Sequence, residues 1–560
     1  MSESTYWTRT AARQLTRRRT LALTGSLAGA AAFAVACGSE SGSKSETRAT
    51  ASSGTGAAQT GAATSATPKE PTGKLTVVVS GLGTQDYDPA ADKNSGEVLV
   101  NAHIGEALAL MGPQKNTYIL GLASAWTTAP DGLSWTFKVR RDAKFHDGTA
   151  VTPEDVKFSI ERFTDPASKP VSGARLSQIL DTITINGDDL TIKLKQPNAD
   201  LIVSVAPAQI TPKAAVQKAG ADFGKNPIGA GPFKFVSGAK DREVVMETFT
   251  GHYRQVAPYK TLTLKIVPEV TTRLAALQTG EADVMLNVSG PAIPAIEGNA
   301  KLKLNQVEST SMNGIVFADL VSPDSFKGSK WADPRMRQAV AHAVDQKQLV
   351  EKIYFNKAVA VAVPWAVPGI PGIDPALKPY AYDPTKAKQL LAAAGYPNGL
   401  EVEIFTYASA AMAGNPECAQ AIGGYLEKVG IKNKVNPIEY ATFLENQRAK
   451  KWAGTGALMV VVQGGRAGES FQPSLSQKGS TPYYFDTALE ELADKQLVIA
   501  DPKERDKVIA DLSRKLYESV ANVPLVSSNY MEGLGDRIKS WTPRVRSGFD
   551  LGMEYIEMKG

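Results

Sequence analysis

Apolar and polar residues alternate along one short segment in the first half of the chain. In residues 133–141, LSWTFKVRR, Trp135, Phe137 and Val139 fall on one face, and the residues between them are polar. A period of two predicts a half-buried β-strand. Asp147-Gly148 follows shortly afterwards and is typical of a tight turn, because glycine accepts a positive φ.

A helical pattern follows this turn. Thr152 is a typical N-cap residue, Pro153 suits the first helical position, and Asp155 stands at N3, close to a capping box. The apolar stripe that comes next at helical spacing consists of Val156, Ile160 and Phe163. We therefore predict a helix that begins at Pro153.

Three further helix starts lie in the second half of the chain. Asp333-Pro334 and Asp383-Pro384 each place an N-cap residue before a proline, and Asp345 opens a segment with glutamine three residues later. Apolar residues recur at helical spacing after each start. These patterns predict a helix-rich α/β protein.

Length and charge narrow the class of protein. A chain of 560 residues is too long for one core, so we expect two or more domains. Its net charge of +5 depends on five arginines in the first 36 residues, and the rest of the chain carries only +1. This small excess gives no support for nucleic-acid binding.

The N-terminus predicts export. Residues 1–36 contain a basic region, which includes Arg17, Arg18 and Arg19, followed by an apolar run over 21–36 that is rich in small residues. This run is too short and too rich in alanine for a membrane span, so it predicts an export signal. The arginine run resembles a twin-arginine signal, and an ordinary secretion signal is the alternative.

A lipid anchor and a tether are predicted after this signal. Ala34-Val35-Ala36-Cys37-Gly38 resembles a bacterial lipobox, although Ala34 stands where that pattern prefers leucine. Cys37 is the expected acylation site. Residues 37–72 are rich in serine, threonine, glycine and alanine, and the part after Cys37 has no large apolar side chain, which predicts a flexible tether.

One stretch concentrates residues that are used in acid–base catalysis. FHDGTAVTPEDVKFSIERF, residues 145–163, holds one histidine, two aspartates and two glutamates. Each acidic residue has a structural role at a turn or helix start, so we interpret His146 as structural too. The sequence shows no nucleophile elbow or phosphate-binding loop, and its four histidines are scattered, so neither a metal nor another cofactor is predicted.

Motifs in a fixed order resemble a known family. The stretch KFHDGTAVTPEDVKFSIERF is followed by NPIGAGPFKF, TTRLAALQTGEADV and ADPRMRQAVAHAVDQKQLVEKIYF. Together they resemble the substrate-binding lipoproteins of peptide-type ABC importers, which are the oligopeptide, dipeptide and nickel class, or solute-binding protein family 5. The resemblance covers essentially residues 73–560.

The resemblance implies an α/β, two-lobed, periplasmic-binding-protein-like fold of class II (cluster C) with an extra inserted subdomain. The implied parts are a base lobe of residues 73–121, 229–311 and 524–560, an inserted subdomain of 122–228, and a second ligand-binding lobe of 312–523. The two lobes would close on a solute.

The second lobe departs from the family pattern. Peptide binders of the family carry an aspartate in a "GDPD"-like segment, but residues 458–475 contain none, and their only charges are Arg466 and Glu469. Glu469 is the candidate replacement, whereas Arg466 favours an anion. The alternative places both residues on a solvated rim. Four further candidates lie at implied lobe junctions, with packing as the alternative role: Asn313, Tyr87, Gln463 and Tyr530.

The resemblance implies a receptor without enzyme activity. Such a receptor is a monomer, anchored by lipid to the outer face of the cell membrane, that captures a peptide or peptide-like solute. It delivers this solute to ABC permease subunits with cytosolic ATPases. Two alternatives stay open, namely a ligand sensor on the same fold and a secreted hydrolase.

Overall fold

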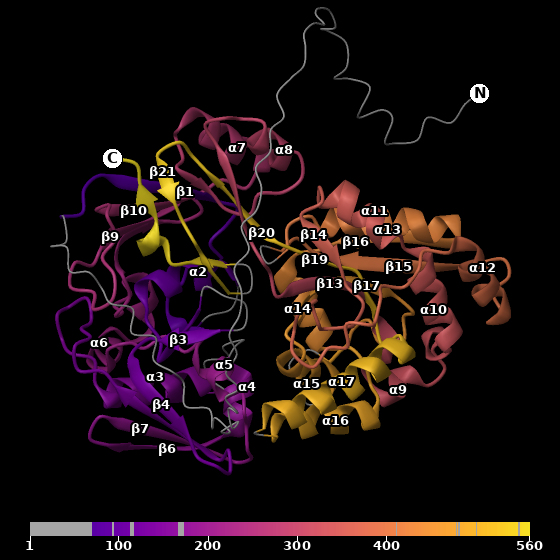
Figure 1. Ribbon diagram of the computed structural model, residues 1–560, viewed down its shortest axis with the longest axis horizontal. Coiled ribbons are helices and arrows are strands. Elements are labelled where there is room, and N and C mark those ends of the chain that lie inside the picture. Colours follow the sequence, from indigo (N-terminus) through magenta and orange to yellow (C-terminus); the bar gives the residue numbers. More distant parts are fainter. Residues whose placement is uncertain are drawn as a thin grey trace, which may run out of the picture. The chain divides into compact units, whose positions relative to one another are not determined.

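The computed structural model describes residues 70–560, except 84, 92–94, 113–116, 166–172, 410–411, 478, 480–481, 500 and 547–548. The predicted export signal, Cys37 and the tether up to residue 69 lie outside the described residues. Figure 1 shows the arrangement of the elements.

A seven-stranded sheet joins the first ordered strand to strands from the middle and the end of the chain. Its order is β12 (Lys303–Val307), β20 (Tyr530–Leu534), β11 (Val284–Met285), β1 (Lys74–Val79), β10 (Thr261–Ile266), β9 (Glu243–Thr248) and β8 (Phe233–Ala239). β1 reads KLTVVV and is buried from its second residue onward. It runs parallel to β10 and β11, as expected for a nearly continuous apolar strand with both faces covered.

Helices supply the cover for this sheet. α2 (Ser95–Ile104) packs against β8, and its apolar residues join the core that contains β1 and β10. α7 (Val270–Thr279) contacts β1 and β11, and α8 (Ala292–Glu297) contacts β12. Their apolar side chains form a second core cluster with residues of β1, β11 and β20.

A separate four-stranded antiparallel sheet is formed by residues between 123 and 194. Its order is β4 (Ala123–Thr128), β5 (Ser134–Val139), β7 (Asp189–Leu194) and β6 (Leu180–Asn186). The alternation in 133–141 is confirmed, because Trp135, Phe137 and Val139 are buried in β5. The helices of this part are α3 (Pro153–Thr164), α4 (Gly173–Ile179), α5 (Leu201–Val205) and α6 (Lys213–Ala219).

The predicted start of α3 is confirmed. The Thr152 hydroxyl accepts a hydrogen bond from the Asp155 backbone N–H at 3.2 Å, and the Asp155 carboxylate accepts one from the Thr152 N–H at 3.1 Å. This reciprocal pair is a complete capping box, which satisfies two backbone donors that the helix itself cannot pair. Asp155 therefore has the structural role at the helix start that the sequence predicts.

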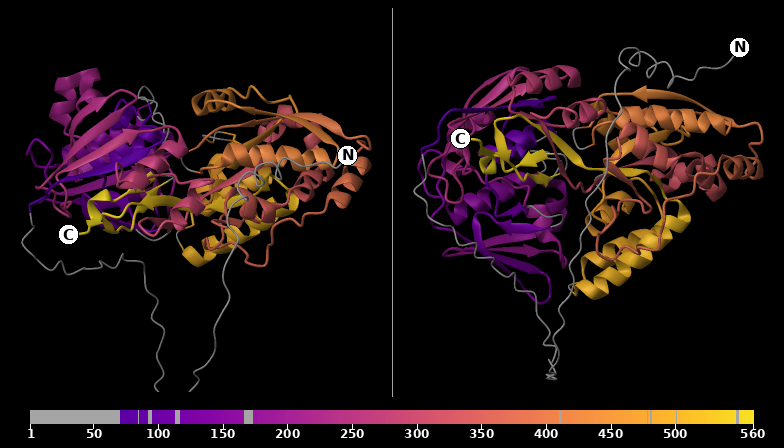
Figure 2. Two further views of the ribbon diagram at one scale, coloured as in Figure 1. Left: turned by 90° about the horizontal axis from the view of Figure 1, so that it is seen from above. Right: turned by 45° about the horizontal axis from the view of Figure 1, so that its top comes forward.

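A five-stranded mixed sheet lies at the centre of the second half of the chain. Its order is β16 (Ile431–Pro437), β15 (Leu400–Thr406), β17 (Leu458–Gly464), β13 (Ser311–Phe317) and β18 (Val523–Pro524). The helices are α10 (Pro334–Ala343), α12 (Pro384–Ala393), α13 (Asn415–Lys428), α14 (Tyr440–Arg448), α15 (Gly468–Leu475), α16 (Thr487–Leu497) and α17 (Pro502–Ser519). α16 and α17 pack side by side (Figure 1, Figure 2).

The three predicted N-caps of this half are observed. Asp333 accepts from the Arg335 N–H, Asp383 accepts from the Lys386 N–H, and Asp345 accepts from the Gln348 N–H. After Asp345 the helix differs from a regular one, because α11 (Gln346–Gln348) passes directly into a π-helical turn over Leu349–Ile353.

Short elements complete the described chain. Four two-stranded pairings are β2 (Ala109–Met111) with β3 (Tyr118–Leu120), β14 (Ala358–Ala360) with β19 (Val526–Ser528), β21 (Ile538–Ser540) with β24 (Glu557–Met558), and β22 (Arg544–Arg546) with β23 (Phe549–Leu551). A short helix α9 spans Pro323–Phe326, and short 3₁₀ helices span Pro89–Ala91, Gly220–Lys225, Ala318–Val321, Lys330–Ala332 and Met553–Tyr555.

Candidate functional site

A tight turn between β17 and α15 carries Arg466. The Gly465 N–H donates to the Thr310 carbonyl at 2.7 Å, and a Cβ on Gly465 would lie 2.3 Å from Val367 Cγ1, so only glycine fits there. Ala467 has a φ of +42°, a backbone conformation that residues other than glycine seldom adopt. Strained backbone of this kind occurs preferentially at functional sites.

The Arg466 side chain reaches the β2–β3 pair. Its Nε donates to Thr310 Oγ1 at 3.2 Å, and one terminal nitrogen donates to the Tyr118 hydroxyl at 3.0 Å. The other terminal nitrogen lies 3.7 Å from Met111 Sδ. Arg466 and Tyr118 are 348 residues apart in sequence, so the fold brings the predicted second-lobe segment next to a strand from the start of the chain.

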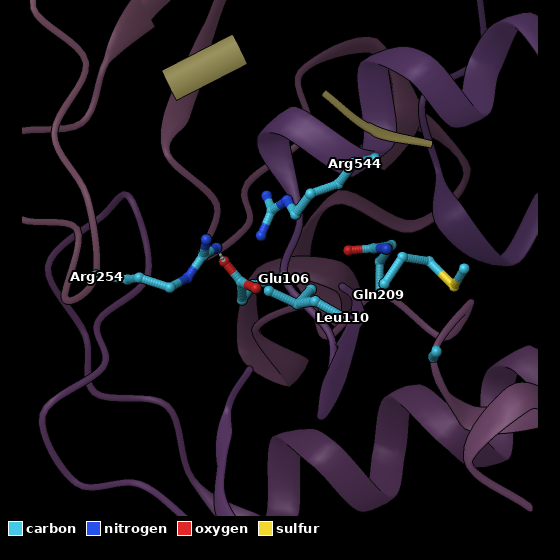
Figure 3. A pocket seen from close by; sticks show the side chains of 8 residues that line it. Glu106, Leu110, Gln209, Arg254 and Arg544 are labelled. Atoms are coloured by element: carbon cyan, nitrogen blue, oxygen red, sulfur yellow. Dashed lines mark hydrogen bonds and ion pairs between the residues drawn. The ribbon is translucent and has the colours of Figure 1, made fainter. Parts of the chain in front are cut away.

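A small cavity lies beside Met111. The centre of a water molecule can occupy a volume of about 20 Å³ inside this cavity. The residues that line it come from α2 and the loop after it, β2, the loop after α5, residue 254 and β22, and they are Ala102, Glu106, Leu110, Met111, Ala206, Gln209, Arg254 and Arg544. Figure 3 shows the Arg544 guanidinium, the Glu106 carboxylate and the Gln209 amide converging on this space.

The wall of the cavity belongs to a buried ion-pair cluster of Glu106, His252, Arg254, Arg544 and Glu554. Glu106 Oε2 lies 2.9 Å from an Arg254 nitrogen and 3.1 Å from His252 Nε2. Glu554 Oε1 lies 3.3 Å from Arg254 and 2.8 Å from Arg544. Both carboxylate side chains are 1% exposed, so the two carboxylates are held almost entirely out of water.

Electrostatics keep both acids ionised. Burial alone would raise the pKa of Glu106, but the Arg254 charge and the hydrogen bond from His252 outweigh it and lower this pKa to about 2. For Glu554, burial likewise opposes ionisation, and the charges of Arg544 and Arg254 outweigh it and lower the pKa. Two carboxylates therefore face two guanidinium groups, and their charges balance.

Comparison with known proteins decides the family. The model of the bacterial extracellular solute-binding proteins, family 5, matches residues 117–476, which is well over half of the chain. The chain belongs to this family. The match includes Tyr118, the signature stretch around His146, and the Arg466 turn.

Curated relatives agree with this assignment. Heme-binding protein A of Haemophilus influenzae is 26% identical over 457 residues, which cover 75% of this chain and 81% of the relative. The glutathione-binding protein GsiB of Shigella boydii is 27% identical over 419 residues, which cover 72% and 80%.

A solved structure agrees on the fold. The periplasmic binding protein DppA of Helicobacter pylori, in complex with the peptide STSA, superposes with a TM-score of 0.73 at 22% identity over 87% of this chain and 98% of that one. The predicted fold class is confirmed, an α/β two-lobed solute-binding fold of family 5. The family also places the protein outside the cytoplasm. The lobe boundaries given above stay a prediction.

His146 of the family signature has a structural environment. Its Nδ1 accepts from the Gly229 N–H at 3.3 Å, and its Nε2 lies 3.0 Å from the Gly231 carbonyl. These partners define the tautomer, because Nδ1 must be unprotonated while Nε2–H donates. Burial, followed by the nearby positive charge of Lys234, outweighs the bond to Gly231 and lowers the pKa of His146 to about 4. The histidine therefore links the signature to the NPIGAGP turn.

Three of the candidates lie on strands, with Asn313 on β13 and Gln463 on β17 of the five-stranded sheet, and Tyr530 on β20 of the seven-stranded sheet. Gln463 Oε1 accepts from Asn522 at 3.1 Å, and Asn313 donates to the Tyr354 hydroxyl at 3.0 Å. The Tyr530 hydroxyl lies 2.9 Å from Ser311 Oγ. All three candidates are buried. Their contact with solute stays a prediction.

The other two candidates differ from this group. Tyr87 is buried in the core of the seven-stranded sheet, where its ring lies 5.8 Å from that of Phe235. Burial raises its pKa to about 12. The backbone of Glu469 belongs to α15, but its side chain lies outside the described part of the structure.

The buried ion-pair cluster and Gln209 are residues that the sequence interpretation missed. The sequence signal for this cluster is Glu106, because it is an acidic residue in the otherwise apolar run IGEALALM. Its partners come from distant segments, and Arg254 and Glu554 are 300 residues apart.

The described residues contain neither a candidate metal site nor a candidate membrane-spanning helix. No group of three or more histidine, cysteine, aspartate or glutamate side chains in the described ranges is placed to bind a metal ion. Within the same ranges, no helix has the length and apolar character needed to cross a bilayer.

Proposed function

We propose that this protein is a receptor that captures a peptide or peptide-like solute outside the cytoplasm and delivers it to an ABC permease with cytosolic ATPases. Family membership supports solute capture. Relatives named for glutathione and for heme, and a structural neighbour in complex with a peptide, support a solute that carries carboxylates. The receptor acts by binding alone and without catalysis.

The observation that carries this proposal is the position of Arg466. Its guanidinium lies between Thr310, which precedes β13, and the β2–β3 pair, where it meets Tyr118 and Met111. A thioether is a weak acceptor. A carboxylate accepts two parallel hydrogen bonds from guanidinium and carries the opposite charge, so it would displace this contact. Arg466 is thus the proposed partner of a solute carboxylate.

Glu469 is the proposed partner of a solute ammonium group. It stands three residues after Arg466, in the first turn of α15. Four further residues are proposed to line the solute site, namely Asn313, Gln463, Tyr530 and Tyr87. The proposed lobes keep the predicted boundaries, which are 73–121, 229–311 and 524–560 for the base lobe, 122–228 for the inserted subdomain and 312–523 for the second lobe.

Contacts between these proposed parts support closure around the solute. The carboxylate of Asp200, a residue of the proposed inserted subdomain, accepts two hydrogen bonds from the Arg505 guanidinium of α17, at 2.8 Å and 2.5 Å. The Ala199 N–H also donates to the Leu497 carbonyl at 3.1 Å. We further propose that acylated Cys37 anchors the receptor, as a monomer, to the outer face of the membrane through its tether.

Calorimetry with the solute that co-purifies from the host tests the role of Arg466. Removing one partner of a buried charge pair costs about 2–5 kcal/mol of binding free energy. Arg466→Ala should therefore weaken binding by about 30-fold or more. Arg141→Ala is the matched control, because the Arg141 side chain is 83% exposed and pairs with Asp188 on the surface.

Glu469→Ala completes the test. It should weaken binding by a similar factor if the solute carries an ammonium group in the closed cleft. Binding within twofold of wild type by both Arg466→Ala and Glu469→Ala protein would place selectivity elsewhere.

A further inference from the structure

Residues that line the cavity beside Met111 carry buried polar atoms without partners. Among the described residues, none bonds to Arg544 Nε, to one terminal nitrogen of Arg544, to Arg254 Nε, to Gln209 Oε1 or to Glu106 Oε1. Arg544 is 8% exposed and Glu106 is 1% exposed. Buried donors and acceptors are normally satisfied, so these atoms indicate a site for a hydrogen-bonding group.

The balance of charge defines the class of this group. The carboxylates of Glu106 and Glu554 already neutralise the guanidinium groups of Arg254 and Arg544. An additional charged group would be buried without a counter-charge, which is strongly unfavourable. An uncharged group therefore fits this balance of two carboxylates and two guanidinium groups.

The free atoms define its hydrogen bonding. The arginine nitrogens need an acceptor, whereas Gln209 Oε1 and Glu106 Oε1 need a donor. A carboxamide or a hydroxyl group supplies both. The converging side chains in Figure 3 place Arg544 on one side of the space and Gln209 on the other.

Met111 connects this cavity to the proposed solute site. Its side chain lines the cavity, and its sulfur lies 3.7 Å from the Arg466 guanidinium. We propose that the cavity is a second solute subsite, which takes an uncharged carboxamide or hydroxyl group of the solute whose carboxylate Arg466 binds. This inference rests on the proposed function and adds the class of solute.

A pair of isosteric peptides tests the subsite. The full chain, purified from its host and freed of solute, is titrated by calorimetry with the tripeptides Ala-Gln-Ala and Ala-Glu-Ala. Wild type should bind the glutamine peptide at least tenfold more tightly. Gln209→Met removes the acceptor at similar size and should reduce this preference to less than twofold.

Gln217→Met is the matched control. Gln217 is exposed on α6 and is absent from the cavity wall, so its substitution should leave the preference unchanged. Equal binding of the two peptides by wild type, tighter binding of the glutamate peptide, or a preference that survives Gln209→Met would each overturn the subsite.

Native mass spectrometry of the solute retained from the host separates the two proposals. One combination of results overturns the subsite alone. In that case neither tripeptide binds, Arg466→Ala protein loses the host solute, and Gln209→Met protein retains it in full. A chain that retains no solute and binds neither tripeptide overturns the receptor function as well.

A crystal structure of wild type with its retained solute separates a solute group from bound water. Solute atoms between Arg544 and Gln209 support the subsite. Ordered water alone in that space, with solute at Arg466, overturns it.

Discussion

From the environment of His146 we predict that the folded protein loses stability in acid, and the structure allows us to quantify this loss. Its pKa is about 4 in the folded protein, against about 6.5 in an unfolded chain. As the pH falls below 6.5, the unfolded state takes up the proton first, so the folded state loses stability. The loss begins near pH 6.5 and is complete once the pH is below 4.

The size of this loss follows from linkage. Each pH unit below the unfolded pKa costs about 1.4 kcal/mol of the free energy of unfolding. At pH 4.5, which is two units below it, His146 therefore removes about 2.5 kcal/mol. Protonation would also break the bond that Nδ1 accepts from the Gly229 N–H. This cost is a large part of the stability of a typical domain.

Urea unfolding of wild type and of His146→Asn protein at pH 7.0 and pH 4.5 measures the effect. Asparagine hydrogen-bonds but does not titrate, and all other groups are common to both proteins. Wild type should therefore lose about 2.5 kcal/mol more than the variant between the two pH values. Its solute affinity at pH 7.0 should match that of the variant within twofold. Equal losses in the two proteins, within about 0.5 kcal/mol, would show that His146 does not lower stability in acid. His146→Gln provides a second variant.

Three other predictions follow from single contacts. Thr152→Ala should lower the free energy of unfolding by about 1 kcal/mol in urea, because it removes the capping box of α3, and an unchanged midpoint would contradict this role. Cys37→Ala should move the protein from the membrane fraction to the medium or to a precursor form, and normal processing with retention would exclude the anchor. Asp200→Asn should speed solute release in stopped-flow measurements, because it weakens the charged pair with Arg505, and an unchanged rate would argue against closure through this pair.

The sequence predicts those features that depend on neighbouring residues. The buried face of β5 and the N-caps at Thr152, Asp333 and Asp383 all follow from residues within one or two turns of each other. The ordered family motifs add the fold, because many local signals in one order specify it.

The site depends on contacts that no local pattern specifies. Arg466 was a candidate because its segment departs from the family pattern, but its contact with Tyr118 crosses 348 residues. The buried ion-pair cluster was missed for the same reason. Arg254 has no local pattern that marks it as buried, and only the fold brings Glu106 and Glu554 next to it.

Native mass spectrometry of wild type and Arg466→Ala protein, both purified from the host, shows whether Arg466 holds the solute. We expect that wild type carries a small solute with at least one carboxylate, and that Arg466→Ala protein is largely free of it, whereas the Arg141→Ala control retains it. Wild type without any bound solute, or equal occupancy in wild type and Arg466→Ala protein, would contradict the role of Arg466 in solute binding.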